Sequence, residues 1–557
     1  MFGGIEARRT ILSVSGYHTI IVGAGSAGCV LGLRLGEDRD KSILILEAGG
    51  GDSHYLLSVP LGVAKVWNDP RFNWSYQTEP EPSAENRRIY IPRGKVVGGS
   101  SSINMMAYVR GHRGDYDRWQ ANGLDAWSYA DVLPYFRKSE AFEDGESFYR
   151  GGRGPLHVHR GGAHDPIYDA FLDSAPELGY AVNSDYNGGE QSGFARAQFT
   201  AREGRRCSAS VAYLRPALAR GNVTLETRVQ VTRVLMQGTR AIGVEYIKNG
   251  ARVQAMAEAE VILSAGAINS PQLLLLSGIG PAAHLQKFGI STLLDLPQVG
   301  QNHQDHPAVR LSYDLAVPSN VRAQLRLDRL ALSMARAYCF GTGFASEPPS
   351  GTTAFFKSDA GQAIPDLQLF CVNAALRANE WFPGWRAPAP DGFAMRACHL
   401  RPESRGSIEL ASNDPFAAPL IRNNFLSTPG DRRALREAIK FSRSIAASVA
   451  FKGLVGAETA PGAAVKSDDE IDAYIRQSVD TIYHPLGACR MGSDADSVVD
   501  MQFRVRGAEG LRVVDASVMP DMVGGNINAP VMMVAEKASD VIRGLAPLPA
   551  AEFSRAT

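Results

Sequence analysis

The chain has 557 residues, of which 45% are hydrophobic and 21% charged, and its 58 Lys and Arg are balanced by 58 Asp and Glu. This length supports two or three hydrophobic cores. Zero net charge argues against a nucleic-acid or anionic-membrane partner, and no run reaches the ~18 apolar residues that cross a bilayer. The six cysteines are scattered without CxxC spacing, so we expect free thiols and no metal site.

The first 16 residues have one short apolar piece after two arginines. This piece is too short to serve as an export signal. We therefore expect residues 1–16 to form a ragged leader and the protein to be cytoplasmic.

The first predicted strand and helix meet at a glycine-rich turn. Residues 17–23, YHTIIVG, are typical of a buried strand, and from Ser26 onward apolar residues recur at helical spacing. The glycines of this stretch are Gly23, Gly25 and Gly28. They allow a tight turn, a close approach to a pyrophosphate and close helix packing, while the helix N–H groups face the phosphates.

A second strand, residues 42–49 (SILILEAG), contains Glu47 close to its end. A carboxylate at this distance from the glycines can hold the hydroxyls of a ribose. The strand, turn, helix and acid together predict dinucleotide binding, whereas a glycine turn used only for packing would not need the acid. This fingerprint leaves open whether the dinucleotide is NAD or FAD.

Three later segments have a similar make-up. Residues 91–119 contain a glycine pair, three serines and Asn104. Such a run either brings backbone amides against an anion or flat ring, or forms a surface turn before a helix. Residues 264–281 join a strand end to a glycine turn and a helix, and residues 511–542 join a strand, Asp515, an Asn-rich turn and a last helix. We therefore predict one nucleotide-binding domain built from discontinuous pieces.

Six motifs in a fixed order carry a resemblance to a known family. Two are long, RGKVVGGSSSINMMAYVRG and GAINSPQLLLLSGIGP, and four are short: NHQDHP, LRPESRGSIEL, YHPLGACRMG and GNINAP. Over residues 17–543 the chain resembles the glucose-methanol-choline (GMC) oxidoreductases, FAD-dependent enzymes that oxidise alcohols. Within that family it is similar to the bacterial branch of choline, sorbose and aliphatic-alcohol dehydrogenases, which includes some oxidases.

The resemblance implies an α/β fold with two domains. The Rossmann-like FAD-binding domain is expected at residues 15–165, 205–310 and 478–545. The substrate domain, with a mostly antiparallel sheet, is expected at residues 166–204 and 311–477. Trp381, Phe382 and Trp385 in its loops either line an entrance for an apolar or aromatic alcohol or anchor a loop or subunit contact. No cage for a cation is visible, so choline is not the favoured substrate.

The resemblance places the active-site histidine at His484 and its partner at Asn528. Hydride leaves an alcohol carbon readily only while the hydroxyl proton is being removed, and a neutral histidine suits that task. The residue after His484 is proline, which restricts its backbone and helps to fix its ring. The Asn528 amide is expected to bond the substrate oxygen. Asn526 is the rival for that role within the same turn, and we expect it to hold the turn beside the flavin. We read His303 and His306 as structural residues, or as residues that support a site residue from behind, because no further Cys or His ligand lies near them.

The resemblance also implies the contacts of the cofactor. The first glycine turn is expected at the pyrophosphate, Glu47 at the ribose, Val231 at the adenine, Asp515 at the ribityl chain and residues 97–104 at the flavin. The candidate FAD-binding residues are Gly23, Gly25, Ser26, Ala27, Gly28, Glu47, Ala48, Val97, Gly98, Gly99, Ser100, Asn104, Met105, Met106, Ala107, Val231, Asp515 and Asn526. FAD should be noncovalent, because Ile103 stands where some relatives carry a histidine bonded to it.

We therefore expect oxidation of a primary alcohol to the aldehyde, or otherwise of an alcohol to a ketone, with hydride transfer to flavin N5. A quinone, a dye-like acceptor or oxygen would then reoxidise the flavin. One alternative is a light-driven flavin decarboxylase, but that branch of the family lacks the histidine found here at 484. The other is a non-catalytic flavoprotein, in which the predicted pair of His484 and Asn528 would have no use. The alcohol, the acceptor and the oligomeric state stay open.

Overall fold

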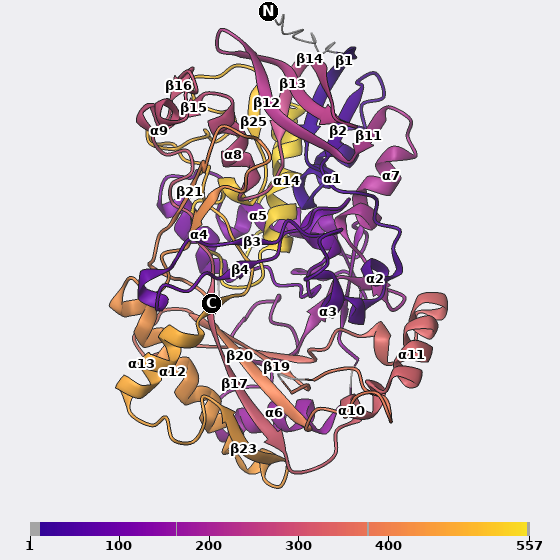
Figure 1. The fold of residues 1–557 in the computed structure, drawn as a ribbon, viewed down its shortest axis with the longest axis vertical. Helices are drawn as coiled ribbons and strands as arrows, with labels where there is room; N and C mark the ends of the chain where they lie inside the picture. Colours follow the sequence, from indigo (N-terminus) through magenta and orange to yellow (C-terminus); the bar gives the residue numbers. More distant parts are fainter. Residues whose placement is uncertain (1–11, 163, 376–377, 554–557) are drawn as a thin grey trace, which may run out of the picture.

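The computed structural model describes residues 12–162, 164–375 and 378–553, which form two bodies, one above the other in Figure 1. The predicted leader falls outside this part up to residue 11. From Leu12 the chain already forms a strand, so the prediction is wrong for residues 12–16. No helix in the described ranges is long and apolar enough to cross a membrane.

The upper body is built on a seven-stranded sheet. Its strands, in spatial order, are β11 (Val223–Thr227), β2 (Ile43–Glu47), β1 (Leu12–Val22), β14 (Ala251–Leu263), β13 (Arg240–Lys248) and β12 (Val229–Gln237), with β25 (Leu511–Val513) paired to β14. β11, β2, β1, β14 and β25 pair in parallel, whereas β13 pairs antiparallel with both β12 and β14. Every residue of β2 is buried, as the apolar run of its first four residues requires, and its last residue is the buried acid Glu47.

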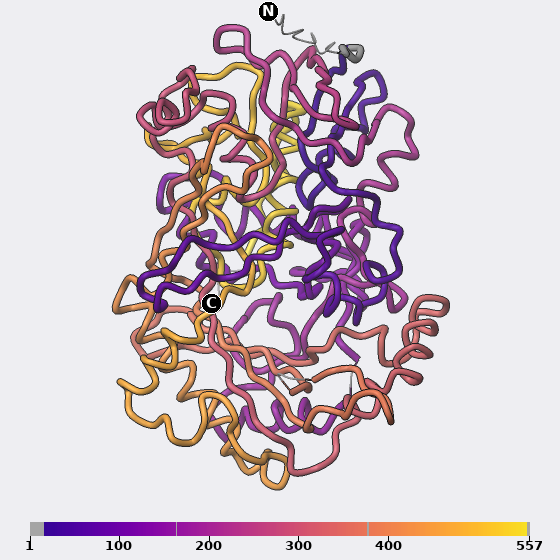
Figure 2. The backbone as a smooth tube through the Cα atoms, in the orientation of Figure 1, coloured from indigo at the N-terminus to yellow at the C-terminus, as the bar shows by residue number. Residues whose placement is uncertain are grey.

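Helices from both ends of the chain pack together on this sheet. Those of the upper body include α1 (Ser26–Leu35), α5 (Tyr129–Ser139), α7 (Arg215–Leu218), α8 (Asn269–Leu276) and α14 (Asn528–Ile542). Arg34 of α1 donates to the buried Glu536 of α14 at 2.7 Å. Figure 2 shows the indigo and yellow ends of the chain side by side in this body. The predicted discontinuous α/β domain is therefore confirmed.

The lower body contains an antiparallel seven-stranded sheet. Its order is β23 (Val455–Ala460), β17 (Pro307–Leu315), β20 (Gly392–His399), β19 (Leu367–Val372), β18 (Thr352–Phe356) and β7 (Gly193–Arg196), with β24 (Asp480–Thr481) paired to β17. The helices that cover its outer face are α6 (Pro166–Glu177), α12 (Pro429–Ala446) and α13 (Asp468–Ser478). One apolar core lies between this sheet and these helices, which leaves the other face of the sheet free to meet the upper body.

The remaining helices and strands lie around the two sheets. The helices among them are α2 (Tyr55–Ser58), α3 (Val63–Val66), α4 (Arg113–Ala121), α9 (Ala282–Lys287), α10 (Asn320–Gln324) and α11 (Leu327–Phe340). The strands include β3 (Tyr76–Gln77), β4 (Tyr90–Ile91), β5 (Glu140–Phe142), β6 (Leu156–Arg160), β8 (Gln198–Phe199), β9 (Ala201–Arg202), β10 (Arg205–Arg206), β15 (Ile279–Gly280), β16 (Leu294–Asp295), β21 (Ser407–Glu409) and β22 (Leu420–Arg422). β21 and β22 belong to the predicted substrate segment 311–477, yet Ile408 and Ile421 pack with Ile268 beside α8 of the upper body. The domain boundaries themselves stay a prediction.

Candidate active site

A cavity of about 580 Å³ lies between the glycine turn after β1 and the inner face of the lower sheet. Residues from segments far apart in the sequence form its wall. The predicted site residues on the wall are Gly23, Gly25, Ser26, Ala27, Glu47, Ala48, Gly99, Ser100, Asn104, Met105, Met106, Ala107, Val231, His484, Asp515, Asn526 and Asn528.

The turn before α1 is shaped for an anion. Gly25 caps α1 without any side-chain hydrogen bond to the first helical N–H groups. Gly23 has a φ of +101°, and a Cβ there would overlap the carbonyl group of Ser264. A Cβ on Gly99 would lie 2.7 Å from the Cα of Gly25, so the two glycine turns touch backbone to backbone. Uncapped N–H groups at a helix N-terminus beside a bare backbone fit a pyrophosphate.

Three of the predicted cofactor contacts, Gly28, Val97 and Gly98, lie behind the cavity wall formed by the described residues. A Cβ on Gly28 would overlap the carbonyl oxygen of Gly23, so this glycine holds α1 close to β1. The N–H of Val97 donates to the Gly50 carbonyl at 2.9 Å, and the N–H of Gly98 donates to a carbonyl of the first turn at 2.7 Å. These residues therefore support the two turns, and the wall is made by their neighbours.

Two buried carboxylates lie at strand ends on the wall. Glu47 closes β2 and accepts the N–H groups of Ala24 and Gly49 at 2.9 and 2.8 Å. Its burial raises its pKa to about 7. Asp515 follows β25 and accepts the N–H of Gly266 at 2.9 Å, and burial raises its pKa as well. Both carboxylates can accept hydrogen bonds from hydroxyl groups of a bound dinucleotide.

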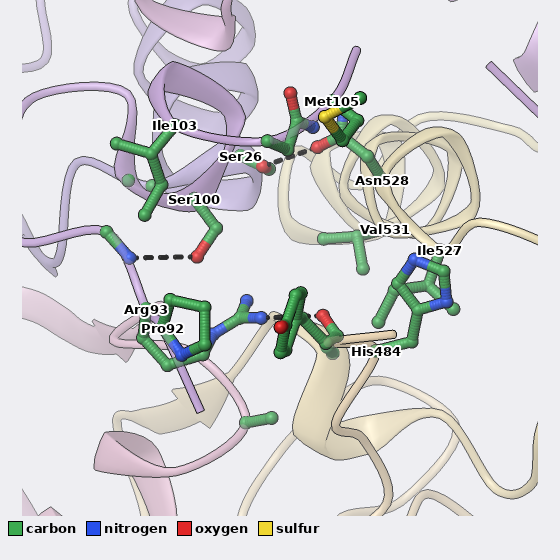
Figure 3. A pocket seen from close by; sticks show the side chains of 18 of the residues that line it. Ser26, Pro92, Arg93, Ser100, Ile103, Met105, His484, Ile527, Asn528 and Val531 are labelled. Carbon is green, nitrogen blue, oxygen red and sulfur yellow. Dashed lines mark hydrogen bonds between the residues drawn. The ribbon is translucent and has the colours of Figure 1, made fainter. Parts of the chain in front are cut away.

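His484 is held from three sides. Its backbone N–H donates to Oδ1 of Asp305 at 2.8 Å. Its Nδ1 lies 2.9 Å from Nδ1 of His306, and its Nε2 lies 3.2 Å from Nδ2 of Asn526. Nε2 of His306 lies 3.0 Å from the carbonyl oxygen of Leu400. In Figure 3, His484 lies on the other side of Val531 from Ser26 and Asn528.

These contacts assign the hydrogens of the two imidazoles. The Leu400 carbonyl only accepts, so Nε2 of His306 carries the hydrogen and its Nδ1 is an acceptor. Nδ1 of His484 must then donate to it, which leaves Nε2 of His484 unprotonated. Asn526 donates its amide hydrogen to this nitrogen. The geometry thus provides a neutral imidazole with one lone pair at the cavity.

Burial keeps both rings neutral. Desolvation lowers the pKa of His306 to about 3. It also lowers the pKa of His484 well below 6.5, with smaller contributions from His306 and from the charges of Arg93 and Arg396. Because a charged imidazole is disfavoured here, Nε2 of His484 is unprotonated at neutral pH and can accept a proton.

The structure changes the expected positions of the two asparagines. Asn528 begins α14, and its Oδ1 accepts the hydroxyl of Ser26 at 2.8 Å on the α1 side of the cavity. Asn526 lies in the turn before the helix and contacts His484. The expected pairing of His484 with Asn528 is therefore corrected to His484 with Asn526. Asn526 and Asn528 are two residues apart at the start of a helix, so their side chains point in different directions. The sequence spacing alone does not show which of the two faces His484.

Two family models for GMC oxidoreductase match residues 17–308 and 402–535. The chain belongs to the GMC oxidoreductase family. It is 43% identical over 538 residues to the mitochondrial choline dehydrogenase of Mus musculus, with 95% of this chain and 89% of the relative covered. It is 43% identical to the oxygen-dependent choline dehydrogenase of Sinorhizobium medicae, with 95% and 96% covered.

A solved structure of similar fold is pyridoxine 4-oxidase from Mesorbium loti. The TM-score is 0.85 and the identity 30%, over 95% of this chain and 100% of that one. Formate oxidase of Aspergillus oryzae matches with a TM-score of 0.87 at 27% identity, over 95% of this chain and 98% of that one. The GMC chain is thus an FAD-dependent alcohol oxidoreductase.

Some residues of this GMC site were not singled out from the sequence. Arg93 lines the cavity and donates to the carbonyl oxygen of Tyr483 at 2.8 Å. Arg93 lies in the glycine- and serine-rich stretch of residues 91–119, so its position in this stretch is the sequence feature that could have indicated a site residue. His306 is expected to be structural or to support a site residue, and its contact with His484 at 2.9 Å agrees with the second role; the sequence could not name that partner, which lies 178 residues away. Arg310 and Arg396 also line the cavity, and no local motif marks them.

The aromatic loop of the GMC chain does not line the cavity that the described residues form. Nε1 of Trp381 donates to the carbonyl oxygen of Arg322 at 2.8 Å. Phe382 and Trp385 are 41% and 64% exposed. Of the two interpretations left open, the contact of Trp381 agrees with the loop anchor. His303, outside this loop, contacts a side chain, with its Nε2 at 2.9 Å from Oδ1 of Asn423.

Proposed function

We propose that this GMC enzyme oxidises a small primary alcohol to its aldehyde, with His484 as the base and Asn526 as the donor to the substrate oxygen. The observation that carries the proposal is the orientation of His484. Its Nε2 is unprotonated, its Nδ1–H is engaged by His306, and it lies on the wall of the cavity. A secondary alcohol would yield a ketone by the same route.

The wall also fits FAD. The uncapped α1 N-terminus would hold the pyrophosphate, Glu47 the ribose hydroxyls, Val231 the adenine and Asp515 the ribityl chain. When bound, FAD supplies the flavin N5 that accepts the hydride. Ile103 lines the cavity with an aliphatic side chain that cannot form a covalent link, which supports noncovalent FAD.

Side chains of the protein carry out the proton transfer. An entering hydroxyl replaces the Asn526 amide at Nε2 of His484, and the freed amide then donates to the substrate oxygen. The proton moves to Nε2 of His484 while its Nδ1–H stays hydrogen-bonded to His306, so the imidazole ring of His484 does not rotate. An isolated imidazolium is disfavoured by burial, but beside an alkoxide it forms as half of an ion pair.

The proposal is tested by anaerobic mixing of FAD-loaded protein with benzylic, furanic, aliphatic and polyol alcohols and with choline, the substrate named for the dehydrogenase relatives. Loss of the visible flavin absorbance with one class, abolished in His484→Ala, is the expected result. If no alcohol bleaches the bound flavin, alcohol oxidation is refuted for this panel. Admitting air afterwards distinguishes an oxidase, which regains colour quickly, from a dehydrogenase that needs a quinone or dye-like acceptor.

A further inference from the structure

The charged side chains on the substrate side of the cavity are positive. Three arginines line the described wall: Arg93, Arg310 and Arg396. The two carboxylates of that wall are Glu47, the last residue of β2, and Asp515, which follows β25, and both lie at the proposed cofactor positions. A substrate that meets the lower sheet therefore meets positive charge.

Two of these arginines lie directly opposite each other on neighbouring strands. Arg310 of β17 and Arg396 of β20 are paired in register, so their side chains share the face of the sheet that lines the cavity. The same row continues through Phe370 of β19 to Thr353 of β18, and both also line the cavity. Like charges directly opposite each other destabilise a sheet unless something neutralises them.

The two arginines differ in what neutralises them. Arg396 donates to Asp480 at 3.0 Å, and its guanidinium lies 5.4 Å from the centre of the Tyr483 ring. The guanidinium of Arg310 makes no ion pair and donates no hydrogen bond within the described part of the chain. It is only partly exposed, at the cavity.

The surroundings of Arg310 make its charge costly without a partner. Desolvation lowers its pKa most, and Arg396 lowers it further, while Asp480, Tyr483 and Tyr474 act in the opposite direction. The charge of Arg396 also acts on His484, so the row of arginines and the proposed base belong to one electrostatic site. An anion placed beside Arg310 would relieve both the desolvation and the repulsion.

We propose that the alcohol oxidised by this enzyme also carries a carboxylate, which Arg310 binds while the hydroxyl group lies at His484. This inference rests on the proposed function and names its substrate class, a hydroxy acid. A guanidinium offers a planar pair of donors that matches a carboxylate. Phe370 in the same row gives the body of the substrate an apolar surface. A quaternary ammonium alcohol would be repelled by the same wall.

A binding experiment tests the carboxylate site without turnover. The FAD-loaded protein is titrated with 4-methylbenzoate and with 4-methylbenzamide, neither of which has a hydroxyl to oxidise, and binding is followed by the shift of the flavin spectrum. A hydrogen-bonded charge is worth ~1.5–3 kcal/mol, so we expect the carboxylate to bind about 10- to 150-fold more tightly than the amide. Equal binding of the two compounds would overturn the inference.

Variants assign that preference to Arg310. Arg310→Gln should lose it, and Arg310→Lys should keep part of it because the charge remains. Arg329→Gln, on the exposed side of α11, is the matched control and should bind like the wild type. A full preference in Arg310→Gln that retains FAD would show that another group binds the carboxylate, which contradicts the inference.

A turnover experiment separates this inference from the proposed function. Flavin bleaching is compared for 4-(hydroxymethyl)benzoate, 4-(hydroxymethyl)benzamide and choline. We expect the hydroxy acid to give the highest second-order rate constant for bleaching, and its advantage over the amide to disappear in Arg310→Gln. Faster bleaching by choline or by the amide would refute the hydroxy-acid inference while supporting alcohol oxidation. If no alcohol bleaches the flavin but benzoate binding still depends on Arg310, the proposed function fails and the carboxylate site stands.

Discussion

The hydrogen bond between His306 and His484 gives a quantitative prediction. In His306→Leu the acceptor of the His484 Nδ1–H disappears from a fully buried position, where the two nitrogens are 2.9 Å apart. A buried donor left without a partner costs ~1–3 kcal/mol. If that cost falls on the reactive tautomer, the rate of flavin reduction should drop about 5- to 150-fold.

The assay is anaerobic flavin reduction by the substrate alcohol, expressed per FAD-loaded protein. His306→Asn is the rescue variant, because its amide oxygen can occupy the position of Nδ1 and accept the same hydrogen. His303→Leu is the control, since His303 is equally buried in the same motif but bonds Asn423 instead of His484. The reasoning is refuted if His306→Leu reduces its flavin at the wild-type rate, or if His303→Leu loses as much as His306→Leu.

Three further predictions concern the base, the asparagines and the glycine turn. Because the pKa of His484 is held well below 6.5, lowering the pH from about 8 to about 6 should leave the rate of flavin reduction unchanged; a fall with its midpoint near 6.5 would contradict this. Asn526→Ala should slow flavin reduction about 100-fold with FAD retained, whereas Asn528→Ala should mainly weaken FAD binding, and the reverse pattern would restore the assignment made from the sequence. Gly28→Ala should lower both FAD content and the thermal midpoint, because its Cβ overlaps a backbone carbonyl, while Gly51→Ala, whose Cβ meets nothing, should change neither.

The local patterns of the sequence were sufficient for the first strand, glycine turn, helix and second strand of the nucleotide-binding domain. β1 ends at Val22, α1 begins at Ser26 and β2 ends at Glu47, as the apolar periodicity and the glycines predict. These features depend on neighbours in sequence. The extension of β1 back to Leu12 depends instead on pairing with β14, whose partner residues lie more than 200 positions away. No local pattern could show that.

The candidate site was predicted less completely, because its side-chain contacts also depend on residues far apart in the sequence. The motifs brought His484, Asp515 and the asparagine turn into one region, but the direction of each side chain depends on where α14 begins. The contact of His306 with His484 and the alignment of two arginines across β17 and β20 depend on long-range packing. Motifs thus predicted which segments meet, while the hydrogen-bond partners required the folded structure.

The central claim is that Nε2 of His484 takes the hydroxyl proton, and one measurement tests it most directly. The rate of anaerobic flavin reduction is measured over a range of pH for wild type and for His484→Ala, both loaded with FAD. General-base catalysis is worth about 10²- to 10⁴-fold, so the variant should be slower by that factor and should recover as rising pH ionises the alcohol. Reduction of the variant at the wild-type rate near neutral pH would contradict the account.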